Sequence, residues 1–234
     1  MTVIRPVFLA DLAGQEPAIR GLGPTTTAAI ERFRRDQAVG SPGRATNGAA
    51  MRALPIGWVL PHDQAERRRQ VTIAMSQATH ADPAALVAAC VISACASWAL
   101  EGASPSLLLE VAAEEAREAA QGVGADERLA EMLTQVSTET WQPPANGISL
   151  DPYDTVAAAL WCATRATSLR SGLVSAAQLG GDTDTVAALV GCKLTAELVR
   201  AELPWHQLVV LPEPESAIAE TAAALATSRA IQSV

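Results

Sequence analysis

A tight turn and the start of a helix meet in Leu179-Gly180-Gly181-Asp182-Thr183-Asp184-Thr185, which runs into the apolar segment 186–192. Two adjacent glycines let the backbone turn sharply and approach a ligand closely. The residues that follow place two carboxylates and a hydroxyl on the first turn of the helix. These oxygens are the hard donors that Mg²⁺, Mn²⁺ and Ca²⁺ prefer. The stretch therefore predicts a helix start and a candidate divalent-cation site.

Helix capping is a purely structural interpretation of the same residues. Asp and Thr are common at helix starts because their oxygens accept hydrogen bonds from unpaired backbone N–H groups. Asp182 alone fits that role, whereas Asp184 adds a like charge that the helix dipole, worth about 0.3–1 kcal/mol, offsets only in part. A divalent cation would neutralise both carboxylates. These residues alone do not distinguish helix capping from metal binding.

The composition indicates one large helical domain. The chain has 234 residues, of which 49% are hydrophobic and only 3% aromatic, so Ala, Leu, Val and Ile must build the core. Because no sustained alternation of polar and apolar residues is found, we predict an all-α fold in a single domain, 1–234. Periodicity and Pro, Gly and Asp positions predict helices at 24–33, 49–54, 62–79, 83–100, 105–121, 126–140, 156–167, 168–178, 182–192 and 215–231.

Charge and hydropathy argue against several classes of function. A net charge of −8 disfavours binding to a nucleic-acid backbone, which requires Lys and Arg to neutralise phosphates. The apolar run 83–100 is long enough to span a membrane, but Asp82 and Glu101 flank it and Ser and Cys interrupt it, so we interpret it as a buried core helix. Four cysteines without paired spacing, and no leader pattern in residues 1–14, predict a reduced, cytoplasmic protein without a membrane span.

Two more loops rich in Gly and small polar residues lead into predicted helices, at 20–27 and 41–48. Such loops suit phosphate groups, which contact backbone N–H groups at helix starts, and they equally suit ordinary turns. His80, at a helix boundary, has the same two interpretations, a ligand contact or a structural residue. The charged run 66–69 and the acidic side of the helix at 105–121 are predicted to face solvent.

Four motifs follow one another along the chain. They are Gly21-Leu22-Gly23-Pro24-Thr25-Thr26, Thr46-Asn47-Gly48-Ala49-Ala50-Met51-Arg52-Ala53-Leu54-Pro55-Ile56-Gly57, Thr79-His80-Ala81-Asp82-Pro83 and Gly180-Gly181-Asp182-Thr183-Asp184-Thr185. In this order they resemble the ADP-ribosylglycohydrolases, and the second and fourth are specific when found together at this separation. The resemblance covers nearly the whole chain. It implies an all-α domain with a dinuclear Mg²⁺ or Mn²⁺ site in a cleft that receives the distal ribose of ADP-ribose.

The resemblance also implies roles for individual residues. Those that match metal ligands are Asp182, Asp184 and Thr185, and the two aspartates are the implied catalytic residues. Those that would line the ribose and phosphate region are Ser41, Gly43, Asn47 and Gly48, with His80 as a cleft residue near the ligand and Asp154 as a weaker candidate for the rim. The implied chemistry is metal-assisted hydrolysis of an N- or O-glycosidic bond.

The sequence departs from the family pattern near its N-terminus. Family members carry a Gly-rich segment with a glutamate and a Thr-Asp-Asp-Thr-like cluster, which supply the other half of the metal shell. Neither is found here, where Asp11 and Glu16 are the only acidic residues before the Gly-Pro-Thr-Thr loop. We expect the chain to begin partway into the family domain and to have an open face that a second copy or a complementing chain covers. Two Asp and a Thr would hold at most one ion weakly, because Mg²⁺ demands octahedral oxygen coordination.

Three functions from different classes follow from the resemblance. The first is a metal-dependent hydrolase of an ADP-ribosyl or related ribosyl bond, acting on ADP-ribose derivatives or ADP-ribosylated substrates. The second is a degenerate family member that binds ADP-ribose or a nucleotide without catalysis. The third is a structural or oligomeric subunit that uses the open face as an interface.

Overall fold

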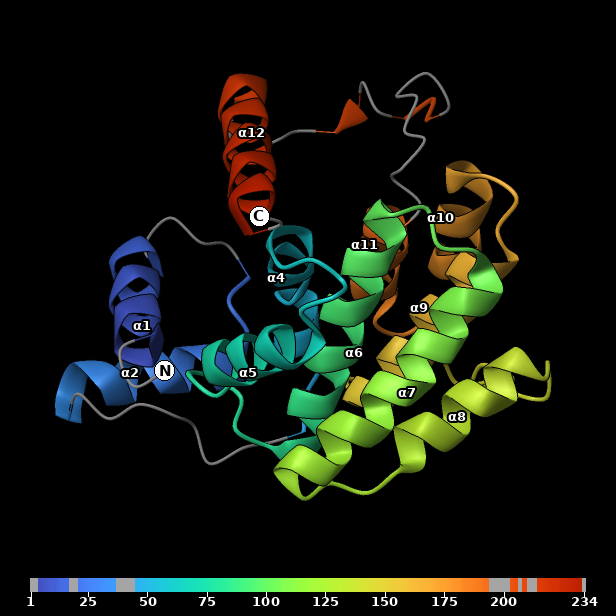
Figure 1. Cartoon of the computed structure of the whole chain (residues 1–234), viewed down its shortest axis with the longest axis horizontal. Helices are drawn as coiled ribbons and strands as arrows, with labels where there is room; N and C mark the ends of the chain where they lie inside the picture. The colour runs from blue at the N-terminus through green and yellow to red at the C-terminus, as the bar shows by residue number, and fades with distance from the viewer. Residues whose placement is uncertain are drawn as a thin grey trace.

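The computed structural model describes residues 4–16, 21–36, 45–193, 203–205, 208–209 and 214–232. Within these residues the chain forms twelve helices and one isolated bridge, between Ile148 and Gly181, but no strand (Figure 1). The predicted all-α fold is confirmed. The helices are α1 (Ile4–Gln15), α2 (Pro24–Asp36), α3 (Gly48–Met51), α4 (Leu54–Val59), α5 (Ala65–Ser76), α6 (Pro83–Leu100), α7 (Pro105–Val123), α8 (Arg128–Ser137), α9 (Pro152–Arg165), α10 (Leu169–Ala177), α11 (Thr183–Lys193) and α12 (Glu215–Gln232).

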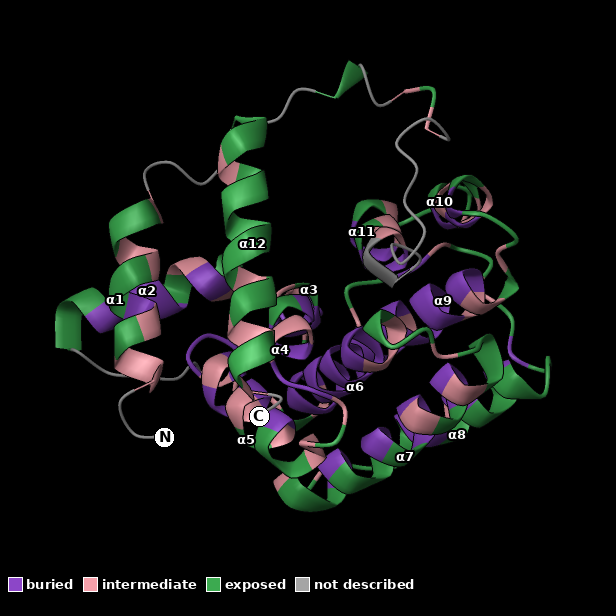
Figure 2. Cartoon of the chain, turned by 45° about the horizontal axis from the view of Figure 1, so that its top comes forward, coloured by how far each residue is buried: buried purple, intermediate pink, exposed green. Residues whose placement is uncertain are grey.

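Helix α6 is the centre of the core. It is apolar or small on every side, which is typical of a helix surrounded by others, and every residue from Ala85 to Ser97 is buried (Figure 2). Asp82 begins the helix by accepting a hydrogen bond from the Ala84 N–H at 2.9 Å. Among the described helices, α6 alone is long and apolar enough to cross a membrane. Because 72% of it is buried inside the protein, it has the burial predicted for a core helix.

The other helices pack around α6. Helices α3, α4, α5, α7, α9 and α11 contact it directly, α8 lies against α7 and α9, and α10 lies against α9 and α11 (Figures 1 and 2). Small residues allow these close approaches. A Cβ atom on Gly57 of α4, for example, would lie 2.1 Å from the Ser93 carbonyl oxygen of α6. Because the core contains few large aromatic side chains, the helices can pack closely against one another.

Helix α12 stands at the edge of the fold and contacts α4 (Figure 1). None of its residues is buried. Arg229 fastens it to the body by donating hydrogen bonds to the carbonyl oxygens of Gly57, at 3.1 Å, and Trp58, at 3.3 Å, and by pairing with Glu101. The predicted C-terminal helix is therefore present, and it lies on the surface.

Two helix starts differ from the prediction. No helix was predicted between 54 and 62, but α4 lies there and has Pro55 in its first turn, where the missing N–H of proline costs nothing. The helix expected from Val156 begins at Pro152, because Asp151 is its N-cap and accepts hydrogen bonds from the Tyr153 and Asp154 N–H groups. In both places a proline in the first turn accompanies a helix start that the sequence prediction missed.

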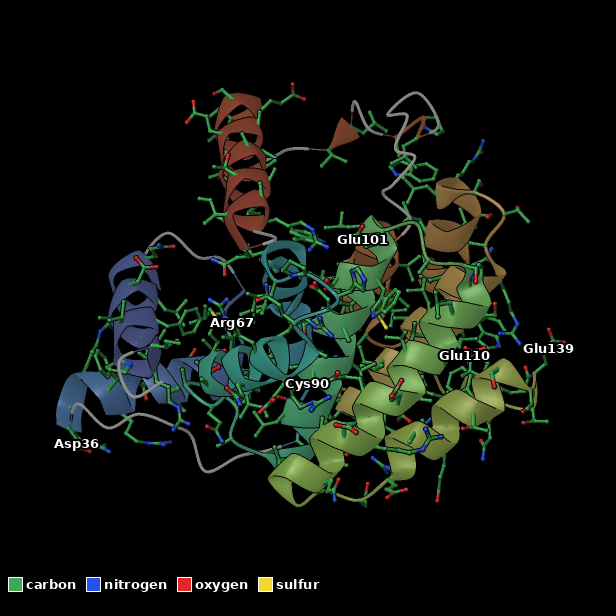
Figure 3. The ribbon with its side chains drawn as sticks, viewed as in Figure 1. Asp36, Arg67, Cys90, Glu101, Glu110 and Glu139 are labelled. Atoms are coloured by element: carbon green, nitrogen blue, oxygen red, sulfur yellow. The ribbon has the colours of Figure 1, made fainter. Side chains whose placement is uncertain are left out.

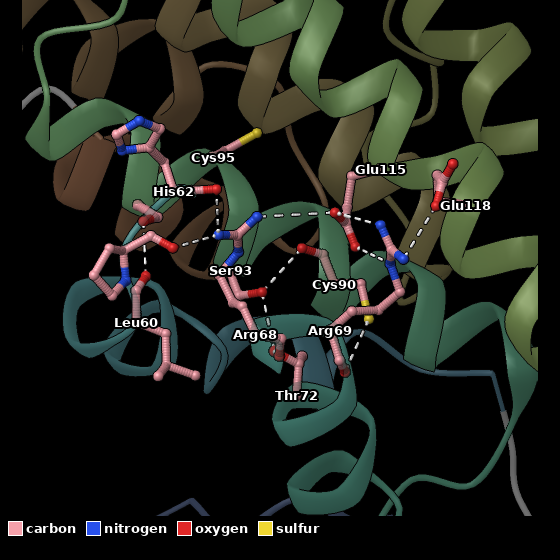
Figure 4. Close-up of polar contacts among 12 residues, drawn as sticks. Leu60, His62, Arg68, Arg69, Thr72, Cys90, Ser93, Cys95, Glu115 and Glu118 are labelled. Atoms are coloured by element: carbon pink, nitrogen blue, oxygen red, sulfur yellow. Dashed lines mark hydrogen bonds and ion pairs between the residues drawn. The ribbon is translucent and has the colours of Figure 1, made fainter. Parts of the chain in front are cut away.

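The prediction that run 66–69 faces solvent is wrong for Arg68, which is 2% exposed. Its guanidinium donates to the Pro61 carbonyl oxygen at 2.9 Å and lies 3.9 Å from Glu115, which is itself 5% exposed (Figure 4). Arg69 donates to the two Glu115 carboxylate oxygens at 2.7 and 3.2 Å. Successive residues lie about 100° apart around a helix, so the four residues 66–69 span most of its circumference and include the side that faces the neighbouring helices. Arg68 and Arg69 therefore join α5 to α7.

The prediction that the acidic side of α7 faces solvent is likewise wrong for Glu115, whereas Glu114 and Glu118 on the same side are exposed. Figure 3 labels Arg67, Glu110 and Glu139, which are exposed, and Cys90, which is buried. Cys90, Cys95 and Cys162 are buried and form no disulfide, as predicted for small core residues. Burial raises the pKa of the Cys90 thiol far above its usual range, so this thiol stays protonated. The side chain of Cys192 lies outside the described residues.

Candidate functional site

The Gly-Gly turn is held against the loop between α8 and α9. Gly180 and Gly181 both adopt left-handed backbone angles, with φ of +75° and +73°. The Ile148 N–H donates to the Gly180 carbonyl oxygen and the Asp182 N–H donates to the Ile148 carbonyl oxygen, each at 2.9 Å. A Cβ atom on Gly181 would lie 2.1 Å from that Ile148 oxygen, so only glycine fits. The turn predicted from the sequence is present. The bridge between Ile148 and Gly181 fixes the backbone position of Asp182, the next residue.

Asp182 meets Asn47 at the start of α11. The Asn47 side-chain amide donates from Nδ2 to Asp182 Oδ2 at 2.5 Å and to Thr155 Oγ1 at 2.9 Å. Asn47 is 4% exposed, and its backbone N–H donates to the Leu150 carbonyl oxygen at 3.1 Å. The structure thus brings together two residues of the sequence-predicted site that are 135 positions apart.

The other two predicted metal ligands lie on the first turn of α11. Asp184 is exposed, whereas Thr185 is 3% exposed and its hydroxyl donates to Met51 Sδ of α3 at 3.7 Å. Residues one apart on a helix point about 100° away from each other, so Asp184 faces outward while Thr185 faces the core. Asp182, just before the helix, is half-buried between solvent and Asn47.

The three side chains have the oxygen chemistry of a site for a hard divalent cation, since carboxylates and hydroxyls are ligands of the kind Mg²⁺ and Mn²⁺ take. In this structure the Asp184 and Thr185 side chains point in different directions, so they do not yet form a closed ligand set. Over the residues that the structure describes, no three His, Cys, Asp or Glu side chains gather in a way that could hold a metal ion. The ligands on α11 would therefore need water or further groups to complete an octahedral shell.

His80 lies behind the Asn47–Gly48 loop. A Cβ atom on Gly48 would lie 2.6 Å from His80 Nε2, so glycine at this position makes room for the imidazole. On the other side of the ring, Nδ1 lies 2.8 Å from Thr79 Oγ1 and 3.4 Å from Arg52 Nη2. Burial, and then the Arg52 charge, lowers the pKa of His80 to about 4. His80 is therefore neutral near pH 7 and is 2% exposed.

The lowered pKa predicts a pH-dependent contribution of His80 to stability. The neutral imidazole is the form that folding favours, so the contribution is complete above the unfolded pKa of about 6.5 and is lost as the pH falls toward 4. We expect the free energy of unfolding to fall by about 2 kcal/mol more between pH 7.5 and 5 in the wild type than in His80→Gln. Urea denaturation at the two pH values measures this difference, and parallel pH profiles would contradict it.

The remaining predicted residues lie around this centre or outside the described part. Asp154 is half-exposed on the first turn of α9, next to Thr155, and accepts a hydrogen bond from Ser149 Oγ at 3.2 Å. No contact joins it to Asn47 or Asp182 among the described interactions. Ser41 and Gly43 lie outside the described residues.

Two parts of the site were missed from the sequence. No role was predicted for Thr155, yet it accepts a hydrogen bond from the Asn47 amide. No role was predicted for the Asn146-Gly147 pair either, although Gly147, with φ of +86°, packs on the Gly180 backbone. The dipeptide signalled a turn, and nothing in its sequence indicated which distant segment it would meet.

Comparison with known proteins places this geometry in a family. The ADP-ribosylglycohydrolase family model matches residues 7–233. The chain belongs to the ADP-ribosylglycohydrolase family. A solved structure described as an ADP-ribosylglycohydrolase-related protein complex has the same fold, with a TM-score of 0.67 and 24% sequence identity, over 98% of this chain and 80% of that chain. No curated protein matches the chain.

Membership links the site to a general class of chemistry. ADP-ribosylglycohydrolases act on ADP-ribose-type glycosidic bonds, bind ADP-ribosylated substrates and are generally metal-dependent. In this family member the paired Asn47 and Asp182, with Asp184 and Thr185 on the adjoining turn, form the candidate site.

Proposed function

We propose that this ADP-ribosylglycohydrolase hydrolyses the glycosidic bond between ADP-ribose and an acceptor with the help of Mg²⁺ or Mn²⁺. The observation that carries the proposal is the 2.5 Å contact between Asn47 Nδ2 and Asp182 Oδ2. It joins the Asn-Gly loop, which leads into α3, to the acidic start of α11. A sugar bound at this junction would meet both the loop and the carboxylates.

Asp182, Asp184 and Thr185 are the residues that would hold the ion. When bound, a divalent cation supplies charge to orient ribose hydroxyls and lowers the pKa of a water molecule. Asp184 is exposed, so the carboxylate oxygen that does not contact the ion would be open to accept a proton from an attacking water. Asn47 restrains one carboxylate oxygen of Asp182, which limits the conformations that the ligand set must lose on binding.

The described ligands leave several coordination positions to other groups. Two carboxylates and one hydroxyl are fewer than the six oxygens that Mg²⁺ takes, so water or a second polypeptide would supply the rest. We propose that a second copy of the chain or a complementing chain covers this side of the site. Light scattering of the active preparation would reveal such an assembly, and full activity from a strict monomer would contradict it.

Release of ADP-ribose from ADP-ribosylated arginine and serine peptides tests the hydrolase proposal. We expect activity with Mg²⁺ or Mn²⁺ and none in excess chelator. We expect Asp182→Asn to lower kcat/KM by about 100-fold or more, because it removes a charge at the reacting centre. Asp126→Asn is the matched control, since Asp126 is an exposed aspartate at the start of another helix, α8. Equal activity of the two variants would contradict the proposed role of Asp182.

A second candidate function is binding of ADP-ribose without hydrolysis. The observation that favours it is that, in the described part of the chain, no three His, Cys, Asp or Glu side chains gather in a way that could hold a metal ion. Calorimetry with ADP-ribose in chelator distinguishes the two functions. Tight binding without metal and without turnover would support the binding protein, whereas metal-dependent turnover would support the hydrolase.

A further inference from the structure

Thr155 has two hydrogen bonds, only one of which its helix explains. It is 0% exposed on the first turn of α9, and its hydroxyl donates to the Asp151 carbonyl oxygen at 3.0 Å. That bond, to the carbonyl four residues earlier, is a common feature of threonines in helices. The second bond, accepted from Asn47 Nδ2 at 2.9 Å, joins α9 to a loop 108 positions away in the sequence.

The first bond decides the direction of the second. A hydroxyl has a single hydrogen, and a carbonyl oxygen can only accept. Because the Thr155 hydrogen is used on the Asp151 carbonyl, Thr155 Oγ1 can only accept from Asn47. The Asn47 side-chain NH₂ group must therefore face Thr155, and its amide oxygen must point elsewhere.

The orientation of Asn47 in turn determines what Asp182 meets. The two hydrogens of Asn47 Nδ2 go to Thr155 Oγ1 and to Asp182 Oδ2. If the amide were reversed, its oxygen would face both an acceptor hydroxyl and a carboxylate, which is repulsive. At ordinary resolution such an amide orientation is assigned from its partners, and here the partners leave one choice.

We infer that Thr155 is a positioning residue, which locks the Asn47 amide so that it donates to Asp182 and holds that carboxylate for a divalent cation. This inference rests on the proposed function in so far as the ion is concerned. The amide lock itself is a property of the chain without metal. Residues that orient metal ligands typically change metal affinity by about 10–100-fold when they are removed.

Two substitutions separate the hydroxyl from the shape of the side chain. Thr155→Val keeps the shape and removes the hydroxyl, whereas Thr155→Ser keeps the hydroxyl. Thr164→Val is the matched control, because Thr164 lies on the same helix and donates to the Leu160 carbonyl oxygen at 2.7 Å without contacting the site. Any general cost of removing such a bond from α9 appears in both valine variants, and thermal unfolding reports whether each folds.

The first readout needs no metal. Hydrogen exchange of the Asn47 side-chain NH₂ group, followed by NMR in chelator, should be faster in Thr155→Val by about tenfold or more than in the wild type. Thr155→Ser and Thr164→Val should exchange like the wild type. Unchanged exchange in a folded Thr155→Val would overturn the inference, whether or not the protein is a hydrolase.

The second readout is Mn²⁺ affinity without substrate, measured by electron paramagnetic resonance. We expect Thr155→Val to weaken binding by about tenfold and Thr155→Ser to restore it to within about threefold of the wild type. Wild-type affinity in Thr155→Val would contradict the positioning role. Absence of Mn²⁺ binding in the wild type, together with faster amide exchange in Thr155→Val, would overturn the proposed metal function and keep the amide lock.

Discussion

A Gly181→Ala variant is expected to lose ribosyl-bond hydrolysis almost completely and to unfold more easily than the wild type. Gly181 has a φ of +73°, at which an alanine is less stable by about 1–2 kcal/mol. The added Cβ would also lie 2.1 Å from the Ile148 carbonyl oxygen. Because the three nearest atoms are all backbone atoms of Ile148, which cannot rotate away as a side chain could, the bridge between Gly181 and Ile148 must open. Asp182 follows in the chain and would move with it, and a shift of about 1 Å at a reacting centre costs about 100-fold in rate.

Gly102→Ala is the matched control for this prediction. Gly102 has a similar φ, +75°, but no atom lies within 4 Å of the Cβ position. It therefore has the backbone penalty without the clash, and we expect a loss of about 1 kcal/mol in unfolding free energy with unchanged activity. The measurements are urea denaturation and kcat/KM for both variants. Equal losses in the two would show that the bridge does not position Asp182.

Glu115→Ala is expected to have the largest effect on stability. The carboxylate is 5% exposed, accepts two hydrogen bonds from Arg69 and lies 3.9 Å from Arg68. Burial raises the pKa of Glu115, and the two arginines oppose that shift. Removing one partner of a buried ion pair leaves a charge without compensation, at a cost of about 3–5 kcal/mol. Urea denaturation measures the loss.

Glu114→Ala provides the comparison on the same helix. Glu114 is exposed, so its removal should change the unfolding free energy by less than about 0.5 kcal/mol. If the two variants were equally stable, the Arg68 guanidinium would not depend on Glu115. The carbonyl oxygens of Pro61 and His62, at 2.9 and 3.3 Å, would then satisfy it alone.

Local signals in the sequence predicted the helices well. Asp82-Pro83 and Ser104-Pro105 start α6 and α7 because an oxygen-bearing cap and a proline both favour a helix start. The same pattern at Asp151-Pro152 was overlooked, which shifted the start of α9. Such signals depend only on residues close together in the chain, so helix starts can be predicted from a single sequence.

Contacts between distant segments could not be predicted in the same way. Nothing near Arg68 indicates that Glu115 of another helix will bury it, and nothing near Thr155 indicates that Asn47 will reach it. These pairs depend on how α6 aligns the helices around it. The acidic start of α11 was predicted as a candidate cation site from its own residues, and the other site residues were predicted from the family resemblance. The groups that position them became visible only in the packing.

The central claim is that the start of α11 binds a divalent cation beside Asn47, and Mn²⁺ titration of the full chain, followed by electron paramagnetic resonance, tests it most directly. The account predicts one weak site in the wild type, unchanged in Asp126→Asn and weakened by about tenfold or more in Asp182→Asn and in Asp184→Asn. Absence of binding in the wild type, or equal affinity in all four proteins, would contradict it.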